Sequence, residues 1–161
     1  QRSSIAVRKR PTVAILSTGD ELVDIDDPLP PGKIVNSNSY ALAELCQAHG
    51  AVPVIYPIIR DSKAEIRRAI EDVSHADFIL SSGGVSVGDY DFVKEVLEEM
   101  DARFLFWRVA MKPGKPLLFC TLGDRPYFGL PGNPVSSIMS FLQFVRPAIR
   151  KASGLDRKSV A

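Results

Sequence analysis

The stretch that decides the fold is Phe78-Ile79-Leu80-Ser81-Ser82-Gly83-Gly84-Val85-Ser86-Val87-Gly88-Asp89-Tyr90-Asp91. Its first three residues are apolar and predict a buried strand, and the segment Ser81–Asp91 after them is rich in glycine and polar residues. The apolar residues that follow have the spacing of one helical face. They are Phe92, Val93, Val96, Leu97 and Met100. The stretch therefore predicts a loop between a buried strand and a helix.

The glycines of this loop suit a bound anion. Gly83, Gly84 and Gly88 let backbone N–H groups turn toward a ligand, and the following helix directs its positive end to the same place. Asp89 and Asp91 have two interpretations, because a carboxylate at a helix start can cap the helix and a carboxylate beside a phosphate can hold Mg²⁺. By itself the loop leaves open a structural connector and a phosphate site.

The composition indicates one globular domain. The chain has 161 residues, of which 45% are hydrophobic and 24% charged, with a net charge of +1. This charge gives no reason to expect nucleic acid, and no apolar run reaches the length of a membrane span. Cys46 and Cys120 have no metal-binding spacing, so we expect buried thiols in a reducing, cytoplasmic compartment. The first residue is Gln1 rather than Met, which suggests a processed or excised piece.

Before the central loop, the chain begins with a tether and a strand–helix unit. Residues 1–10 are polar and basic and are expected to be the tether, and Thr12–Ser17 reads as the first buried strand. No regular element is expected from Val23 to Gly32, which is rich in acids and prolines. The cluster Asn36–Ser39 then opens a helix that Gly50 ends, and we interpret this cluster as helix capping alone.

A second strand–helix unit follows. Val52–Ile59 reads as a strand whose two prolines favour an edge position or an early bend. Ser62 to Glu65 form a capping-box pattern that starts the next helix. Because Ser62 supplies the cap, Asp61 at the end of the strand is left for another role.

Past the central loop, Ala102–Trp107 is strand-like and leads into a cationic turn. This turn, Arg108–Pro116, carries three cations, two prolines and one glycine. A stiff turn loses little entropy on binding, so it suits a compact polyanion, although an ordinary surface turn remains an alternative. The three cations are Arg108, Lys112 and Lys115.

The last part of the chain predicts a hairpin and a helix. Leu117–Leu122 and Pro126–Leu130 are short strands joined by a tight turn. Asn133 is expected to cap the final helix, with Pro134 at its first position. Pro147 is expected to break or kink this helix before its end.

This alternation of strands and helices predicts a three-layer α/β fold, in which a mainly parallel, mixed sheet has helices on both faces. Such sheets bind ligands at the carboxyl ends of their strands, so the polar loops should crowd one edge. The carboxylates and cations of these loops fit Mg²⁺-assisted handling of a phosphate compound. The four carboxylates are Glu21, Asp61, Asp89 and Asp91.

Several other enzyme classes lack support. No Gly-x-Gly-x-x-Gly pattern opens the first helix and no GxxxxGK[ST] pattern occurs, which argues against a dinucleotide-dependent oxidoreductase and a P-loop ATPase. Neither His49 nor His75 lies in a candidate loop, so a Ser/His/Asp hydrolase is also unsupported.

Four motifs carry a resemblance to the MoeA family, the molybdopterin molybdotransferases, which includes the E domain of gephyrin. In order they are Ser17-Thr18-Gly19-Asp20-Glu21-Leu22, Ser82-Gly83-Gly84-Val85-Ser86-Val87-Gly88-Asp89-Tyr90-Asp91, Met111-Lys112-Pro113-Gly114-Lys115-Pro116 and Leu130-Pro131-Gly132-Asn133-Pro134-Val135-Ser136. A sister family, the MogA-type molybdopterin adenylyltransferases, shares the fold but typically has Thr after the two glycines. Val85 and Ser86 at that place favour the MoeA side.

The resemblance implies the final step of molybdenum cofactor synthesis, in which molybdate enters the dithiolene of adenylylated molybdopterin and AMP is released with the help of Mg²⁺. It implies required roles for Glu21, Asp61, Asp91 and Lys112. Asp61 and Asp91 would be the Mg²⁺ ligands. Arg108 stands where the family often has Lys, which keeps the charge and changes the donor geometry.

The same resemblance implies a wider substrate-binding set on the four loops. Lys112 and Lys115 would bind phosphate or molybdate, the latter together with Ser136 or Ser137. The full set is Thr18, Gly19, Asp20, Ser82, Gly83, Gly84, Val85, Ser86, Gly88, Asp89, Pro113, Gly114, Lys115, Pro116, Pro131, Gly132, Asn133, Pro134, Ser136 and Ser137.

Members of the family resemble elongated homodimers of four-domain subunits. This chain would supply only the central domain, residues 11–154, between the tether 1–10 and a tail 155–161 that leads to a missing domain. We therefore expect the isolated domain to be weakly active or inactive. Two alternatives stay open, a molybdopterin adenylyltransferase and a non-catalytic scaffold of the gephyrin kind.

Overall fold

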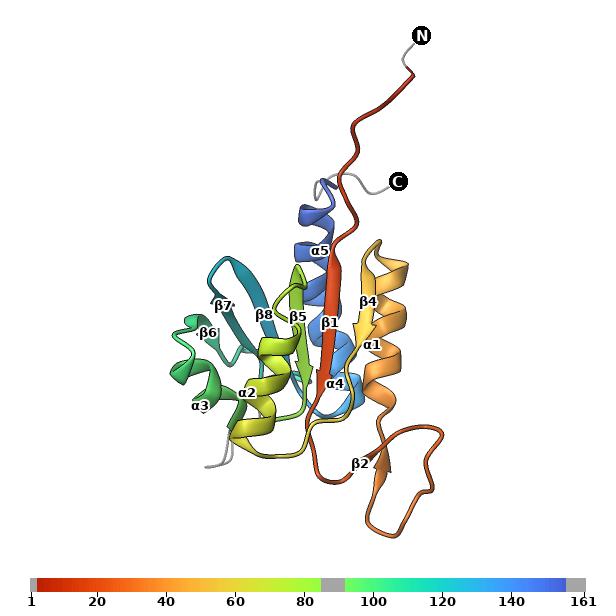
Figure 1. Ribbon diagram of the computed structural model, residues 1–161, viewed down its shortest axis with the longest axis vertical. Helices are drawn as coiled ribbons and strands as arrows, with labels where there is room; N and C mark the ends of the chain where they lie inside the picture. Colours follow the sequence, from red (N-terminus) through yellow and green to blue (C-terminus); the bar gives the residue numbers. More distant parts are fainter. Residues whose placement is uncertain (1–2, 85–91, 156–161) are drawn as a thin grey trace.

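The computed structural model describes residues 3–84 and 92–155, which form a six-stranded sheet between two layers of helices (Figure 1). The strand order is β4-β1-β5-β8-β7-β6. The first four strands in this order are mutually parallel, and β7 is antiparallel to both of its neighbours. The strands are β1 (Thr12–Ser17), β4 (Val52–Ile55), β5 (Phe78–Ser82), β6 (Arg103–Trp107), β7 (Leu118–Leu122) and β8 (Arg125–Leu130). The predicted mainly parallel, mixed sheet is confirmed.

Apolar residues of the central strands alternate between two cores, one on each face of the sheet. On β1, Val13 and Ile15 join the core that contains Leu42 of α1, whereas Ala14 and Leu16 join the core that contains Ile66 of α2. Burying one such aliphatic side chain contributes about 1.5–3 kcal/mol, so the two cores hold the three layers together. The helices are α1 (Ser37–Ala48), α2 (Lys63–Asp72), α3 (Phe92–Glu99), α4 (Pro134–Ser140), the π-helical turn η1 (Phe141–Val145) and α5 (Arg146–Ala152).

Side-chain caps start the helices where the sequence predicts them. The Ser62 hydroxyl accepts the Glu65 N–H at 3.3 Å, and the Asn133 side chain accepts the Ser136 N–H at 3.2 Å. At the start of α1 the cap is Asn36, whose side-chain oxygen accepts the Ser39 N–H at 3.4 Å. Each cap satisfies a backbone donor that the helix itself cannot pair.

Two features of the first half differ from the prediction. The segment expected to lack regular structure is bounded by a small parallel pair, β2 (Leu22–Val23) and β3 (Ile34–Val35), so Val23 belongs to a strand. Two-residue strands have no periodicity that a sequence pattern can reveal. The edge position of β4 is confirmed, but this strand ends at Ile55, and the chain returns to the sheet only at the Thr18–Ile59 bridge. Pro57 has no N–H to donate in between.

The helix is not broken at Pro147, because it runs on to Ala152, and the alternative expectation of a kink there stays a prediction. Pro147 lies in the first turn of α5, directly after the turn η1. A π-helical turn shifts the hydrogen-bond pattern by one residue, which accommodates the missing proline N–H without ending the helix.

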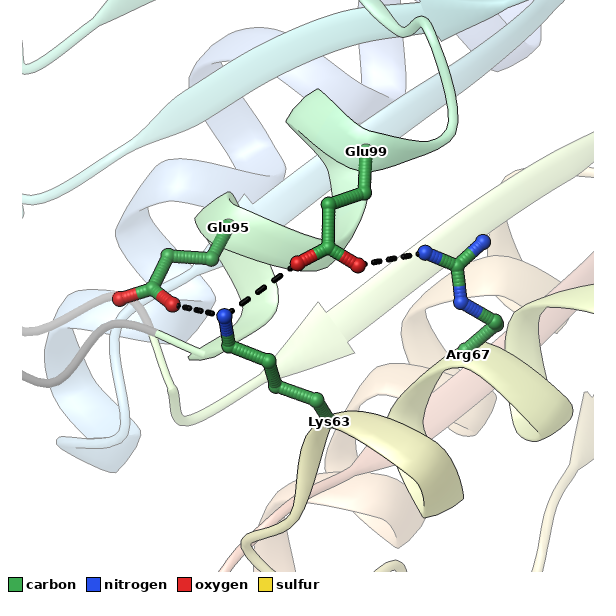
Figure 2. Close-up of polar contacts among 4 residues, drawn as sticks. All are labelled: Lys63, Arg67, Glu95 and Glu99. Carbon is green, nitrogen blue, oxygen red and sulfur yellow. Dashed lines mark hydrogen bonds and ion pairs between the residues drawn. The ribbon is translucent and has the colours of Figure 1, made fainter.

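Exposed ion pairs link α2 to α3 (Figure 2). Lys63 Nζ lies 2.5 Å from a Glu95 oxygen and 3.2 Å from a Glu99 oxygen, and Arg67 lies 2.6 Å from the other Glu99 oxygen. The helix α2 begins shortly after Asp61, so these pairs connect the start of α2 with the body of α3. Because all four side chains are solvent-exposed, the pairs contribute little to stability.

The two cysteines are buried, free thiols, as the sequence predicts. Burial raises the pKa of both Cys46 and Cys120 to about 12, so both stay protonated and unreactive at neutral pH. Among residues 3–84 and 92–155, no helix has the length and apolar character needed to cross a membrane.

Candidate functional site

The parallel strands place the polar loops on one edge of the sheet. The carboxyl ends of β4, β1, β5 and β8 point the same way, toward the end of the molecule where β2 lies (Figure 1). Strand β6 is antiparallel to β7 and therefore ends at this edge too. We call this edge the strand-end rim. It is the edge at which an α/β sheet binds ligands.

At the centre of the rim, glycines allow the loops to touch. Gly83 and Gly84 have φ values of 88° and 69°, and a Cβ on Gly83 would lie 2.7 Å from the Thr18 carbonyl oxygen. The Gly83 N–H donates to Leu130 O at 3.3 Å, which joins the end of β5 to the end of β8. A side chain at position 83 would therefore push the ends of β1 and β5 apart.

A buried hydroxyl lies under the same loop. Thr18 is 5% exposed, and its Oγ1 has no hydrogen-bond partner among the described residues. This oxygen would lie 2.9 Å from a Cβ on Gly84, so it faces the loop at Gly83 and Gly84. A buried hydroxyl without a partner is costly, and a ligand or water in this place would satisfy it.

A pocket of about 90 Å³ opens beside Thr18, between β1, α1, β5 and the end of β8. Its lining combines hydroxyls, amides, glycines and one carboxylate with apolar side chains, so it offers a few hydrogen-bonding groups in a partly apolar setting. The lining residues are Ser17, Thr18, Glu21, Leu22, Ile34, Val35, Asn36, Ser37, Asn38, Ser82, Gly83, Gly132 and Pro134.

Carboxylates gather at the β4–β1 end of the rim. Asp20 and Asp61 line a wider hollow of about 740 Å³, and the Asp61 N–H donates to the Asp20 carboxylate at 3.3 Å. Lys33 Nζ donates to the Asp20 backbone carbonyl at 2.5 Å and lines the same hollow. Asp20 therefore braces the loop as well as lining it, which the sequence did not indicate.

Asp61 is the carboxylate with a perturbed acidity. Partial desolvation raises the pKa of Asp61, and the negative charges of Glu21 and Asp20 add to the rise, against a backbone hydrogen bond at Asp20 that lowers it. A cation would relieve this concentration of negative charge. Mg²⁺ is commonly held by one or two carboxylates together with phosphate oxygens and water, so Asp61 fits as one ligand. Among the described residues, no group of three or more acidic, His or Cys side chains could hold a metal by itself.

The cationic turn lies at the β6–β7 end of the rim. The Arg108 N–H donates to Leu117 O at 2.8 Å, and the Val109 N–H donates to Lys115 O at 3.0 Å. Gly114 is buried in the turn with φ of 109°, and a Cβ there would lie 3.0 Å from Ser140 Oγ of α4. The turn therefore packs on α4, near Ser136 and Ser140, with the side chain of Lys115 exposed.

Arg108 is held differently from the two lysines. Its guanidinium lies 4.5 Å from the centre of the Trp107 ring, and its backbone has a positive φ of 77°. Stacking on an indole face favours the planar guanidinium over an ammonium group. The side chain of Arg108 is thus directed along the edge strand β6, whereas Lys112 is exposed on the turn.

The loop after β8 supplies the last group of candidates. Asn133 caps α4, Pro134 is its first residue, and Ser136 donates its N–H to the cap. Ser137 is 1% exposed, and its Oγ has no partner among the described residues. A Cβ on Gly132 would lie 3.7 Å from Gly83 Cα, so the loop after β8 packs directly on the central glycines.

The strand order separates the strands that carry Glu21 and Asp61 from the strands that carry the cationic turn. Neighbouring strands lie about 4.8 Å apart, so β1 and β6 are about 19 Å apart across four steps. Glu21 and Asp61 therefore lie on the same rim as Lys112 but well away from it. A ligand that contacts the ends of both β1 and β6 would have to span about this distance.

Five of the predicted site residues lie outside the part of the chain that the structure describes. They are Val85, Ser86, Gly88, Asp89 and Asp91.

Asn38 was interpreted as part of a capping cluster, yet its amide donates to Ser82 Oγ at 2.7 Å and to Gly132 O at 2.8 Å. A helix needs only one N-cap, and Asn36 fills that role. The other polar residues of the cluster are therefore free for contacts elsewhere, and this surplus is the signal that could have pointed to Asn38.

Fold and rim together define an α/β domain with a ligand-binding edge at the carboxyl ends of its parallel strands. Residues 14–151 match the family described as "Probable molybdopterin binding domain", and the chain belongs to this family. The predicted resemblance is confirmed at this level.

Curated relatives are named for molybdenum cofactor synthesis. Over 98% of this chain, the sequence is 47% identical to "Molybdopterin molybdenumtransferase" of Nostoc. Over 94% of this chain, it is 44% identical to "Molybdenum cofactor synthesis protein cinnamon" of Drosophila melanogaster. These matches cover 37% and 25% of the two relatives. The chain thus spans about a third or less of the length of these proteins.

Solved structures agree with the fold. The molybdopterin biosynthesis MoeA protein of Pyrococcus horikoshii is 33% identical and superposes with a TM-score of 0.82, over 90% of this chain and 36% of that one. A structure of molybdenum cofactor biosynthesis protein B superposes with a TM-score of 0.69 at 16% identity, which shows a shared fold alone. That protein is matched over 97% of its length.

Proposed function

We propose that this chain is the molybdopterin-binding domain of a molybdopterin molybdotransferase. The full protein would insert molybdate into the dithiolene of adenylylated molybdopterin and release AMP by cleaving the phosphoanhydride. The observation that carries the proposal is the strand-end rim, where described parts of four motifs meet on one edge of the sheet. The names of the relatives support the substrate class.

The division of charge along the rim supports separate roles. Asp61, with Asp91, would hold Mg²⁺ on the phosphoanhydride side, where desolvation and then the negative charges of Glu21 and Asp20 raise the pKa of Asp61. Bound there, Mg²⁺ would offset the charge of the phosphates. Glu21 lines the adjoining pocket and would hold the ligand beside the metal.

The opposite end of the rim would bind anions. Lys112 and Lys115 would contact phosphate or molybdate oxygens, with Ser136 or Ser137 donating a hydrogen bond to molybdate. Arg108, stacked on Trp107, would add a fixed positive charge to this end. The glycines between the two ends would let backbone N–H groups approach the ligand.

The setting of the domain is part of the same proposal. The longer protein would work as a cytoplasmic homodimer, with residues 11–154 as one domain of several. Two buried, free cysteines are in keeping with a reducing compartment.

Complementation tests the proposal. In the full-length protein, Asp61→Ala, Asp91→Ala and Lys112→Ala should each abolish molybdoenzyme activity in a cell that lacks the endogenous protein. The matched control is Asp124→Ala, an exposed carboxylate in the β7–β8 turn at the opposite edge of the sheet. Restoration by the three rim variants would refute the catalytic assignment and favour a scaffold role. Mg-ATP-dependent adenylylation of molybdopterin by this chain would instead establish the adenylyltransferase alternative.

A further inference from the structure

Asn38 lies where three parts of the rim meet. It belongs to the first turn of α1, its side chain is half-buried, and it lines the 90 Å³ pocket. Its side-chain nitrogen donates to Ser82 Oγ at the end of β5 and to Gly132 O after β8. One side chain therefore joins a helix start to the ends of two neighbouring strands.

The chemistry of the partners fixes how this amide is oriented. A backbone carbonyl can only accept, so the atom of Asn38 that faces Gly132 O must be the nitrogen. The nitrogen carries two protons, and the second one points to Ser82 Oγ. Ser82 therefore accepts from Asn38, and its own hydroxyl proton remains available for another acceptor.

Ser82 is 3% exposed and lines the pocket beside Thr18, whose hydroxyl has no partner among the described residues. A hydroxyl that accepts one hydrogen bond becomes a better donor of the next. The pocket thus contains one hydroxyl already set as a donor and a second hydroxyl without a protein partner. An acceptor-bearing polar group of a ligand would satisfy both.

We propose that Asn38 is a positioning residue that holds the ends of β5 and β8 together and presents the Ser82 hydroxyl as a hydrogen-bond donor in the pocket. Asn38 is not needed to start α1, because Asn36 caps that helix. Its two hydrogen bonds span 44 and 94 residues of sequence, so they constrain the site rather than the local helix. The consequence for ligand binding rests on the proposed function.

Two substitutions separate the two parts of the role. Asn38→Ala removes both donors. Asn38→Asp keeps the shape, but its carboxylate faces the Gly132 carbonyl and accepts the Ser82 proton, which reverses that hydrogen bond. Gln47→Glu is the matched control, because it makes the same amide-to-acid change at an exposed position near the other end of α1.

The first measurement is amide hydrogen exchange of the chain without ligand. Asn38→Ala should raise exchange at Gly83, whose N–H donates to Leu130 O, by about fivefold to tenfold, as expected for the loss of one ordinary hydrogen bond, while exchange within α1 stays unchanged. Unchanged exchange at Gly83 would overturn the proposal. So would an equal rise along all of α1, which would mean that Asn38 only stabilises the helix.

The second measurement is the affinity for molybdopterin, followed by titration. Asn38→Asp should weaken binding by about tenfold and more than Asn38→Ala, whereas Gln47→Glu should bind as the parent chain does. Adding Asn38→Asp to Ser82→Ala should cost less than it does alone, because both act through one proton. Equal affinity of the parent and Asn38→Asp would overturn the inference. A parent chain that does not bind molybdopterin would instead refute the proposed function, leaving hydrogen exchange to decide the positioning role.

Discussion

Gly83 shows how a single residue serves both packing and binding. Its missing Cβ leaves room for the Thr18 carbonyl oxygen, and its positive φ turns the chain sharply at the end of β5. Both properties are needed before any ligand arrives. A glycine-rich loop at this place is therefore part of the fold as well as part of the site.

We predict that Gly83→Ala lowers the free energy of unfolding by about 3 kcal/mol or more, because a backbone clash adds to the strain of a positive φ. Gly123→Ala is the control, since Gly123 has φ of 57° and nothing lies within 4 Å of its added Cβ. This control should cost only about 1–2 kcal/mol. Urea unfolding measures both, and equal losses would mean that the Thr18 contact is unimportant.

Asp61 should lower the stability of the domain while serving the site. Its pKa is raised, so folding favours the neutral acid and the ionised form is destabilising above that pKa. We predict that Asp61→Asn is slightly more stable than the parent at pH 7, and that the advantage disappears as the pH falls below the ordinary range of an aspartate. Unfolding by urea at pH 7 and pH 3 tests this. A variant that is less stable at pH 7 would show that the carboxylate supports the fold.

The site residues differ in how far sequence could predict them. Asp61 could be found because Ser62 already filled the capping role, and that reasoning agrees with the cap in the structure. The stacking of Arg108 on Trp107 could not be predicted from the sequence, because it depends on a positive φ that no sequence pattern indicates at a non-glycine residue. Asn38 was hidden because capping gave a sufficient explanation for its whole cluster.

The helices α2 and α3 follow two of the rim loops, and their ion pairs bind one helix to the other (Figure 2). Arg67 and then Lys63 lower the pKa of Glu99. A carboxylate with a lowered pKa stabilises the fold above its ordinary pKa and loses this contribution as the pH falls through the lowered value.

We predict that Glu99→Gln causes a small loss of stability at pH 7 that shrinks in 1 M NaCl and disappears in acid. Screening weakens exposed pairs, and protonation removes the charge of the parent carboxylate. Thermal unfolding across salt and pH measures the effect, with Glu44→Gln on α1 as an exposed control. A loss that persists in acid would point to packing rather than charge.

Elements with a clear period could be predicted, and those set by tertiary contacts could not. The strand β1 and the buried face of α2 follow directly from apolar spacing. The pair β2–β3 forms because Ile34 N–H meets Glu21 O at 2.9 Å, a contact between segments with no repeating pattern. The turn η1 likewise has no sequence pattern of its own. It lies just before Pro147, and whether a proline ends a helix depends on how the surrounding core packs.

Across the whole molecule, the order of strands arranges charge along one edge. Carboxylates lie at the β4–β1 end together with Lys33 and Arg60, glycines and hydroxyls lie at the centre, and the cationic turn lies at the β6–β7 end. Parallel pairing brings the end of β5 beside the end of β1, although the paired residues are 65 positions apart in the sequence. A ligand with a metal-bound phosphate group at one end and an oxyanion at the other would match this order.

The most direct test is a crystal structure of this chain soaked with AMP and molybdate. The account predicts density for both along the strand-end rim, with contacts to Lys115, Ser136 and the Gly83 loop. Well-ordered AMP and molybdate at the opposite edge, or on a helical face with the rim empty, would contradict it.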